Sequence, residues 1–206
     1  MLPILFSFRR CPYAMRARIG MALSGIDYIL REVDLKNKPD ALYAVSPKAT
    51  VPVLIAHDLI IDESLEIINW LSGAEILKQQ SSLKEVAKNL NNSFIPILNQ
   101  FKYPNRFENA LSKDDCVVFL QDYLHIINNQ VASLDYSFYY EDEVVIFPFI
   151  RQLRIADELW FNSLGLKELY SWVSRWDKII DEHNIMAKYP VWNSDDSAVV
   201  INNTRA

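Results

Sequence analysis

The spacing of apolar residues changes once along the chain, near residue 73. Before that point, short apolar runs alternate with segments in which apolar residues recur every three or four positions. The pattern predicts strands at 3–7, 26–33, 51–56 and 59–61 and helices at 12–24, 37–44 and 62–71. The order β-α-β-α-β-β-α requires both parallel and antiparallel pairing. We therefore expect a mixed four-stranded sheet in an α/β domain over residues 1–75.

The rest of the chain has helical spacing and little strand character. After a polar linker at 76–82, the apolar positions predict four long helices, at 83–102, 113–133, 147–163 and 166–183. An aromatic and acidic loop, 135–143, is expected between the second and third of these. Residues 83–206 are therefore predicted to form an all-α domain, with 193–206 as a loosely held polar tail.

Charge and composition exclude several classes of partner. The net charge is −5, and the 21 basic residues are scattered among 26 acidic ones, so no basic face for a nucleic acid is expected. The three histidines lie apart from one another and from the cysteines, which predicts no metal site. With four glycines there is no phosphate-binding loop, and no nucleotide cofactor is expected.

The apolar segments also bear on the location of the protein. None approaches the roughly 18 uninterrupted apolar residues of a membrane span, and the first residues do not read as a signal peptide. The two cysteines, Cys11 and Cys116, are too few and too far apart for a disulfide framework. We expect no membrane partner and a reducing, cytoplasmic location.

Cys11 is the first candidate for chemistry, because it stands where the first strand leads into the first helix. Unpaired amides and the positive end of the helix dipole favour a thiolate there, and Arg9, Arg10 and Arg16 add positive charge. Pro12 suits the first turn of the helix. The alternative is a buried structural cysteine, which is how we interpret Cys116.

Two further segments have the chemistry of a receptor for a small peptide. Thr50-Val51-Pro52-Val53 is compatible with a cis bond before Pro52, which would leave the Val51 backbone open to pair with an extended peptide. Asp62-Glu63-Ser64 begins a helix, where free amides and a hydroxyl can bind a carboxylate and an acidic side chain can bind an ammonium group. Taken alone, each segment has a commoner explanation, because most X-Pro bonds are trans and Asp62-Glu63-Ser64 is more often an ordinary helix cap.

These segments together resemble a known family. Cys11-Pro-Tyr-Ala-Met-Arg-Ala-Arg, Lys36-Asn-Lys-Pro, Ser46-Pro-Lys-Ala-Thr-Val-Pro-Val-Leu and Asp62-Glu-Ser are similar to motifs in the thioredoxin-like N-terminal domain of glutathione transferases, and most similar to the cysteine-type omega class. The resemblance covers about the first 75 residues. It extends to the helical half only in organisation, as an all-α C-terminal domain.

The resemblance implies a role for each matching residue. Cys11 would be the catalytic residue and form a mixed disulfide with glutathione as co-substrate. The Val51 backbone would pair with the tripeptide before a cis-Pro52. Glu63 and Ser64 would hold the γ-glutamyl end. Lys38 would contact the glycyl carboxylate, although a solvated lysine is an equal alternative.

Two departures from the family pattern limit these implications. Ala14 stands where glutaredoxin-type members have a second cysteine, so external glutathione would have to resolve the mixed disulfide. In the helical half, Arg154-Ile-Ala-Asp157 keeps the aspartate of a Ser/Thr-x-x-Asp capping box without its hydroxyl.

Three functions remain open on sequence. The first is a glutathione-dependent thiol transferase or reductase that acts on disulfide substrates through Cys11. The second is conjugation of glutathione to small hydrophobic electrophiles in detoxification, with Tyr13 or Ser7 presenting a hydroxyl to the glutathione sulfur. The third is a non-catalytic binding or regulatory protein with the transferase fold. The resemblance also implies a homodimer, and a second-substrate pocket between the halves near Tyr103, Phe107 and residues 136–140.

Overall fold

The computed structural model describes residues 1–72, 77–78, 81–194 and 196–203 and divides the chain into two compact units. The sheet unit comprises Met1–Leu77 and Lys178–Ala206, and the helical unit comprises Lys78–Asp177. Most of the predicted linker at 76–82 lies outside the described residues. The C-terminal boundary differs from the predicted domain 83–206, because the last segment of the chain belongs with the sheet unit.

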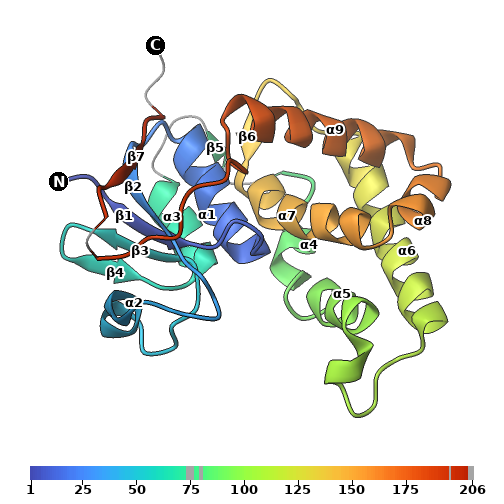
Figure 1. Cartoon of the computed structure of the whole chain (residues 1–206). Coiled ribbons are helices and arrows are strands. Elements are labelled where there is room, and N and C mark those ends of the chain that lie inside the picture. Colours follow the sequence, from blue (N-terminus) through green and yellow to red (C-terminus); the bar gives the residue numbers. More distant parts are fainter. Residues whose placement is uncertain (73–76, 79–80, 195, 204–206) are drawn as a thin grey trace. The chain divides into compact units, whose positions relative to one another are not determined.

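The sheet unit has the predicted order of elements. Its elements are β1 (Ile4–Ser7), α1 (Pro12–Leu23), β2 (Tyr28–Glu32), α2 (Asp40–Val45), β3 (Val53–Ala56), β4 (Leu59–Ile61), α3 (Ser64–Leu71) and β7 (Val199–Ile201). The strand order is β4-β3-β1-β2-β7, in which only β1 and β2 pair in parallel. The mixed sheet of a thioredoxin-like domain is therefore confirmed (Figure 1).

The predicted number of strands is wrong by one, because the sheet has five. Strand β7 runs antiparallel beside β2, with Leu30 opposite Val199 (Figure 1). Beyond it, the Asn203 amide donates to Asp27 Oδ1 at 2.6 Å. A three-residue apolar run among polar residues has no strand signal of its own. It forms a strand because it satisfies the backbone groups of the edge strand β2.

Helices α1 and α3 pack closely at Gly20. A β-carbon at this position would lie 2.7 Å from Leu71 Cδ1 and 2.8 Å from Ile68 Cδ1, so a larger residue would require these two side chains to turn away. Helix α1 ends as predicted before Gly25, whose φ of 66° is in the left-handed region. The helix that follows Cys11 therefore packs against α3 at Gly20 and ends before Gly25.

An apolar cluster joins the sheet, α2 and the start of α1. Phe6, Val53 and Leu42 are fully buried in it, and Cys11 and Trp192 pack against its margin. The Trp192 ring meets Phe6 edge-on with centroids 5.8 Å apart. The candidate cysteine therefore lies at the edge of a packed core.

A buried ion pair between Arg18 of α1 and Glu32 of β2 is connected to the loop before Cys11. Arg18 Nε donates to Ser7 Oγ at 2.7 Å, and Glu32 Oε1 accepts from the Arg9 amide at 2.7 Å. The C-terminal segment joins the same network, because the Ile185 carbonyl accepts from Arg18 Nη1 at 3.2 Å. A polar network of this kind is costly to disturb when it is fully paired.

The helical unit contains more and shorter helices than predicted. Its elements are α4 (Lys84–Asn89), α5 (Phe94–Lys102), η1 (Pro104–Arg106), α6 (Lys113–Val131), β6 (Tyr139–Tyr140), α7 (Glu141–Ala156), α8 (Glu158–Ser163) and α9 (Lys167–Glu182), the last of which continues into the sheet unit. The two-residue strand β5 (Leu77–Lys78) stands at the boundary between the units. The prediction that this region is mostly helical is confirmed.

Two of the predicted long helices are interrupted, and one begins early. Segment 83–102 divides into α4 and α5, and Ser93 Oγ donates to the Asn89 carbonyl at 2.6 Å at the break. Segment 147–163 divides at Asp157, whose Oδ1 accepts from the Trp160 amide at 3.1 Å and caps α8. Helix α7 begins at Glu141, inside the predicted loop, because Glu143 Oε2 accepts from the Tyr140 amide at 3.1 Å.

Glu143 is also the polar centre of the helical unit. Its fully buried carboxylate accepts from Trp172 Nε1 at 2.7 Å, Trp176 Nε1 at 3.1 Å and Arg175 Nη1 at 3.0 Å. Burial raises the pKa of Glu143, whereas Arg175 and the two indoles lower it. These contacts tie the start of α7 to α9.

Candidate active site

Cys11 occupies the predicted position at the N-terminus of α1. It is the N-cap residue, with φ −80° and ψ 121°, and its carbonyl accepts from the Met15 amide at 2.9 Å. Its amide donates to the Phe8 carbonyl at 2.9 Å, which tightens the loop from β1. The half-buried thiol donates to the Val51 carbonyl, with Sγ and O 3.6 Å apart. The structure therefore brings Cys11 and Val51 together.

Two opposing effects act on the pKa of the Cys11 thiol. Burial raises the pKa of the thiol above its ordinary value of 9.0, although the Ala14 and Tyr13 amides and the Arg16 charge all lower it. The lowering contributions are those expected of a helix N-terminus. They are outweighed because the sulfur lies against an apolar cluster that solvates a thiolate poorly. Burial and the helix N-terminus therefore act in opposite directions on the pKa of Cys11, and burial is the larger effect.

The peptide bond between Val51 and Pro52 is cis, as the sequence suggested. Both residues are buried, and strand β3 begins just after them at Val53. The Val51 carbonyl accepts from Cys11, and no hydrogen bond of the Val51 amide is found within the described part of the chain. One backbone donor next to the thiol is therefore open to an incoming peptide.

The start of α3 carries the other predicted receptor. Ser64 is buried in the first turn, and its Oγ accepts from Arg16 Nη1 at 3.2 Å. Glu63 is the N-cap residue and is largely exposed. Asp62, where the sequence predicted that the helix begins, lies before α3 and accepts from Ser46 Oγ at 3.0 Å.

Two residues with site contacts were not predicted as binding residues. Arg16 is fully buried 3.2 Å from Ser64, and burial lowers its pKa to about 10, whereas Tyr13 and Cys11 raise it. Lys48 Nζ lies 2.6 Å from Glu63 Oε1 and 3.1 Å from Asp62 Oδ2. Both residues stood inside the quoted motifs. Their side-chain contacts depend on tertiary neighbours that the motifs do not specify.

The remaining candidates are less closely tied to the thiol. Tyr13 is 37% exposed, and Arg16 lies over its ring, 5.3 Å from the centroid. Burial raises the Tyr13 pKa, Arg16 lowers it, and Cys11 and Glu63 raise it, so these four side chains share one electrostatic environment. Lys38 is half-buried in the loop before α2, and no contact joins it to the other candidates among the described residues. Its role stays a prediction.

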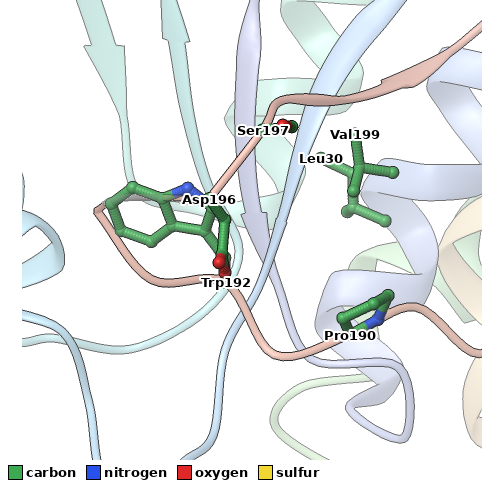
Figure 2. A pocket seen from close by; sticks show the side chains of 6 residues that line it. All are labelled: Leu30, Pro190, Trp192, Asp196, Ser197 and Val199. Carbon is green, nitrogen blue, oxygen red and sulfur yellow. The ribbon is translucent and has the colours of Figure 1, made fainter.

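A separate small cavity lies between β2 and the C-terminal segment of the chain. It measures about 230 Å³ and is lined by Leu30, Pro190, Trp192, Asp196, Ser197 and Val199 (Figure 2). None of the predicted site residues lines it. The cavity therefore forms where the C-terminal segment covers the edge of the sheet.

Within residues 1–72, 77–78, 81–194 and 196–203, no group of three or more His, Cys, Asp or Glu side chains could hold a metal ion. No helix in the same part of the chain is long and apolar enough to cross a membrane.

Comparison with known sequences identifies the N-terminal region. The family described as "Glutathione S-transferase, N-terminal domain" matches residues 5–75. A "probable glutathione transferase" of Aplysia californica is 41% identical over 66 residues, which cover 32% of this chain and 72% of that protein. The chain therefore belongs to the glutathione transferase family of enzymes.

Other relatives are matched over a smaller share of their length. A "probable maleylacetoacetate isomerase" of Caenorhabditis elegans is 37% identical over 71 residues, which cover 34% of this chain and 33% of that protein. This relative is therefore matched over about a third of its own length.

Solved structures extend the likeness of fold to most of the chain. The tau-class glutathione S-transferase MiGSTU of mango has a TM-score of 0.71 at 21% identity, covering 90% of this chain and 98% of that one. Glutathione transferase Omega 3C of Trametes versicolor has a TM-score of 0.71 at 15% identity, covering 90% and 88%. These structures show the transferase fold.

Proposed function

We propose that this protein is a glutathione-dependent thiol transferase of the cysteine type, with Cys11 as its nucleophile. The Cys11 thiolate attacks the glutathione sulfur of a mixed disulfide R–S–SG, which forms Cys11–S–SG and releases the thiol R–SH after protonation. The thiolate of a second glutathione then attacks the same sulfur, which releases oxidised glutathione and restores Cys11. The net reaction is the exchange of R–S–SG and one free glutathione for R–SH and oxidised glutathione, so one glutathione is consumed in each cycle.

The contact between Cys11 and Val51 carries this proposal. A substrate peptide paired with the Val51 backbone would place its own sulfur next to Cys11 Sγ, which lies 3.6 Å from the Val51 carbonyl oxygen. Ala14 supplies no second thiol three residues on, so the cycle needs external glutathione. The cysteine-type, omega-like residues of the N-terminal motifs support the same chemistry.

Glutathione binding is proposed at the residues around this contact. The Val51 backbone, beside Pro52, would pair with the cysteinyl part of the tripeptide. Ser64, held by Arg16, and the free amides of α3 would take the γ-glutamyl carboxylate, and Glu63 would take its ammonium group. Tyr13 would border the sulfur and Lys38 the glycyl carboxylate. Solved relatives such as rice GST1 are described in complex with glutathione.

Conjugation is the second candidate, and one observation favours it. The Cys11 thiol donates a hydrogen bond to the Val51 carbonyl, and burial raises its pKa, which favours this donating form; a bound glutathione thiolate would accept the same hydrogen bond as it would from a hydroxyl. The glutathione sulfur would then attack a hydrophobic electrophile. The structural likeness to tau-class transferases is compatible with this chemistry as well.

Incubation with oxidised glutathione, followed by intact-mass measurement and peptide mapping, tests the proposal. One adduct on Cys11, removed by reduced glutathione, is expected in the wild type and in Cys116→Ala. Cys11→Ala should form no adduct and lose reduction of 2-hydroxyethyl disulfide entirely. Full activity of Cys11→Ala in that assay would refute the mechanism. Retained conjugation of 1-chloro-2,4-dinitrobenzene alone would favour the second candidate.

The family resemblance also supports a homodimer in the cytoplasm. Size-exclusion chromatography with light scattering tests the dimer, which requires twice the mass of one chain. Cell fractionation tests the location. Retention on immobilised glutathione separates both enzymatic candidates from a non-catalytic binding protein.

A further inference from the structure

Lys48 lies in a position that neither proposed reaction explains. Its ammonium nitrogen sits between two carboxylates, 2.6 Å from Glu63 Oε1 and 3.1 Å from Asp62 Oδ2. The hydrogen bonds that Lys48 donates to Glu63 and Asp62 raise the pKa of Lys48, and the bond to Asp62 lowers the pKa of that carboxyl. Lys48 therefore stays fully charged in this place.

The turn that carries Lys48 is itself attached to the start of α3. The Ala49 amide donates to the Ser46 carbonyl at 2.8 Å, and buried Ala49 adopts a φ of 46°, which is unusual for a residue with a β-carbon. Ser46 Oγ donates to Asp62 Oδ2 at 3.0 Å. Ser46 and Lys48 of this turn thus contact the same carboxylate, Asp62, and this arrangement orients the Lys48 side chain toward the start of α3.

The group that occupies this place is a primary ammonium. The α-amino group of a γ-glutamyl peptide is also a primary ammonium at neutral pH, with the same three donors. Under the proposed function, Glu63 is the acceptor of that substrate group. In the free protein this acceptor already has an ammonium partner from the chain itself.

We propose that Lys48 is an internal competitor for the γ-glutamyl ammonium, which must leave Glu63 before glutathione binds fully. This inference rests on the proposed function. The competition lowers the affinity for ligands with a free α-ammonium and leaves ligands without one unaffected. Lys48 therefore determines specificity for ligands with or without a free α-ammonium group, because its side chain must move away before the γ-glutamyl end can bind Glu63.

The size of the effect is limited by solvent. The side chains of Lys48 and Glu63 are 51% and 63% exposed, and exposed pairs interact weakly. Replacement of Lys48 by methionine should therefore strengthen glutathione binding about two- to five-fold. Lys48→Arg keeps the charge and should bind as the wild type does. Lys88→Met, at an exposed position of α4, is the matched control for the loss of one positive charge.

A chemical double-mutant cycle provides the test. Isothermal titration under reducing conditions compares glutathione with glutaryl-cysteinylglycine, which lacks only the α-ammonium, on the wild type and on Lys48→Met. We expect tighter glutathione binding by Lys48→Met and no tighter binding of the analogue, with folding checked by circular dichroism.

The other outcomes overturn the inference in different ways. Unchanged or weaker glutathione binding by Lys48→Met would show that Lys48 does not compete, and a selective loss would indicate that it binds a substrate carboxylate. An equal gain for both ligands, or a gain by Lys88→Met, would reduce the effect to overall charge. Absence of glutathione binding by the wild type would overturn the proposed function itself, and the inference with it.

Discussion

The reactivity of Cys11 should depend strongly on pH, because its pKa lies above the ordinary 9.0. A thiol with a pKa of 9 is about 1% thiolate at pH 7, and a higher pKa gives less. Only the thiolate reacts with iodoacetamide. The rate of Cys11 alkylation should therefore rise about tenfold for each pH unit between pH 6 and 8 and continue to rise without a plateau up to pH 9.

The assay uses Cys116→Ala, so that Cys11 is the single thiol, and follows alkylation by intact mass from pH 6 to 10. Arg16→Met provides a second point, because the Arg16 charge lowers the Cys11 pKa. Its loss should raise the pKa further and slow alkylation at every pH below the plateau. A rate that levels off near pH 7 would refute the reasoning, since it would mean that the helix N-terminus outweighs burial.

Three further predictions concern stability and are measured by urea or thermal unfolding. Gly20→Ala should change the unfolding free energy by no more than about 1 kcal/mol, because the methyl groups of Leu71 and Ile68 can turn away and alanine favours the helix by a similar energy; a loss above about 3 kcal/mol would show that these two side chains cannot move. Glu143→Ala should cost about 3–5 kcal/mol, because Arg175 and two indoles lose their acceptor; a loss below about 1 kcal/mol would show that water replaces it. Truncation before Ala198 should remove the β7 pairing, which is worth about 2 kcal/mol, and lower Tm by roughly 2–4 °C for each kcal/mol lost. The truncated chains should also associate with one another through the exposed β2 edge. A monodisperse variant with an unchanged Tm would argue against both effects.

The helices and strands predicted for the sheet unit are found where the residues that start and stop an element agree with the spacing of its apolar positions. The helix after Cys11 is marked by Pro12 at its start and Gly25 beyond its end, and the structure places α1 between them. The turn at His57-Asp58 separates two apolar runs, and strands β3 and β4 form there. These signals act over a few residues, so a single sequence contains them.

The helical unit shows where periodicity alone is insufficient. A continuous apolar period suggested one helix at 83–102 and another at 147–163, yet each is divided. The breaks depend on single polar side chains, Ser93 and Asp157, that bond to nearby backbone groups. Such bonds compete with the helix by small energies, and the apolar period does not record them.

For the candidate site, the sequence by itself determined the residue types and their local setting. It placed a cysteine at a helix N-terminus, a proline before a strand and an acidic pair at the start of a helix, and it pointed to the transferase family. These features follow from neighbours along the chain and from motif spacing.

Only the tertiary structure decided how these groups act on one another. The burial of Cys11 against residues from several elements reversed the direction of its pKa, and Lys48 met Asp62 and Glu63 across a separation of about 15 residues. The fifth strand likewise required β2 and β7, which are far apart in sequence. Desolvation, ion pairing and strand pairing depend on which groups meet in space, and that is fixed only when the whole chain packs.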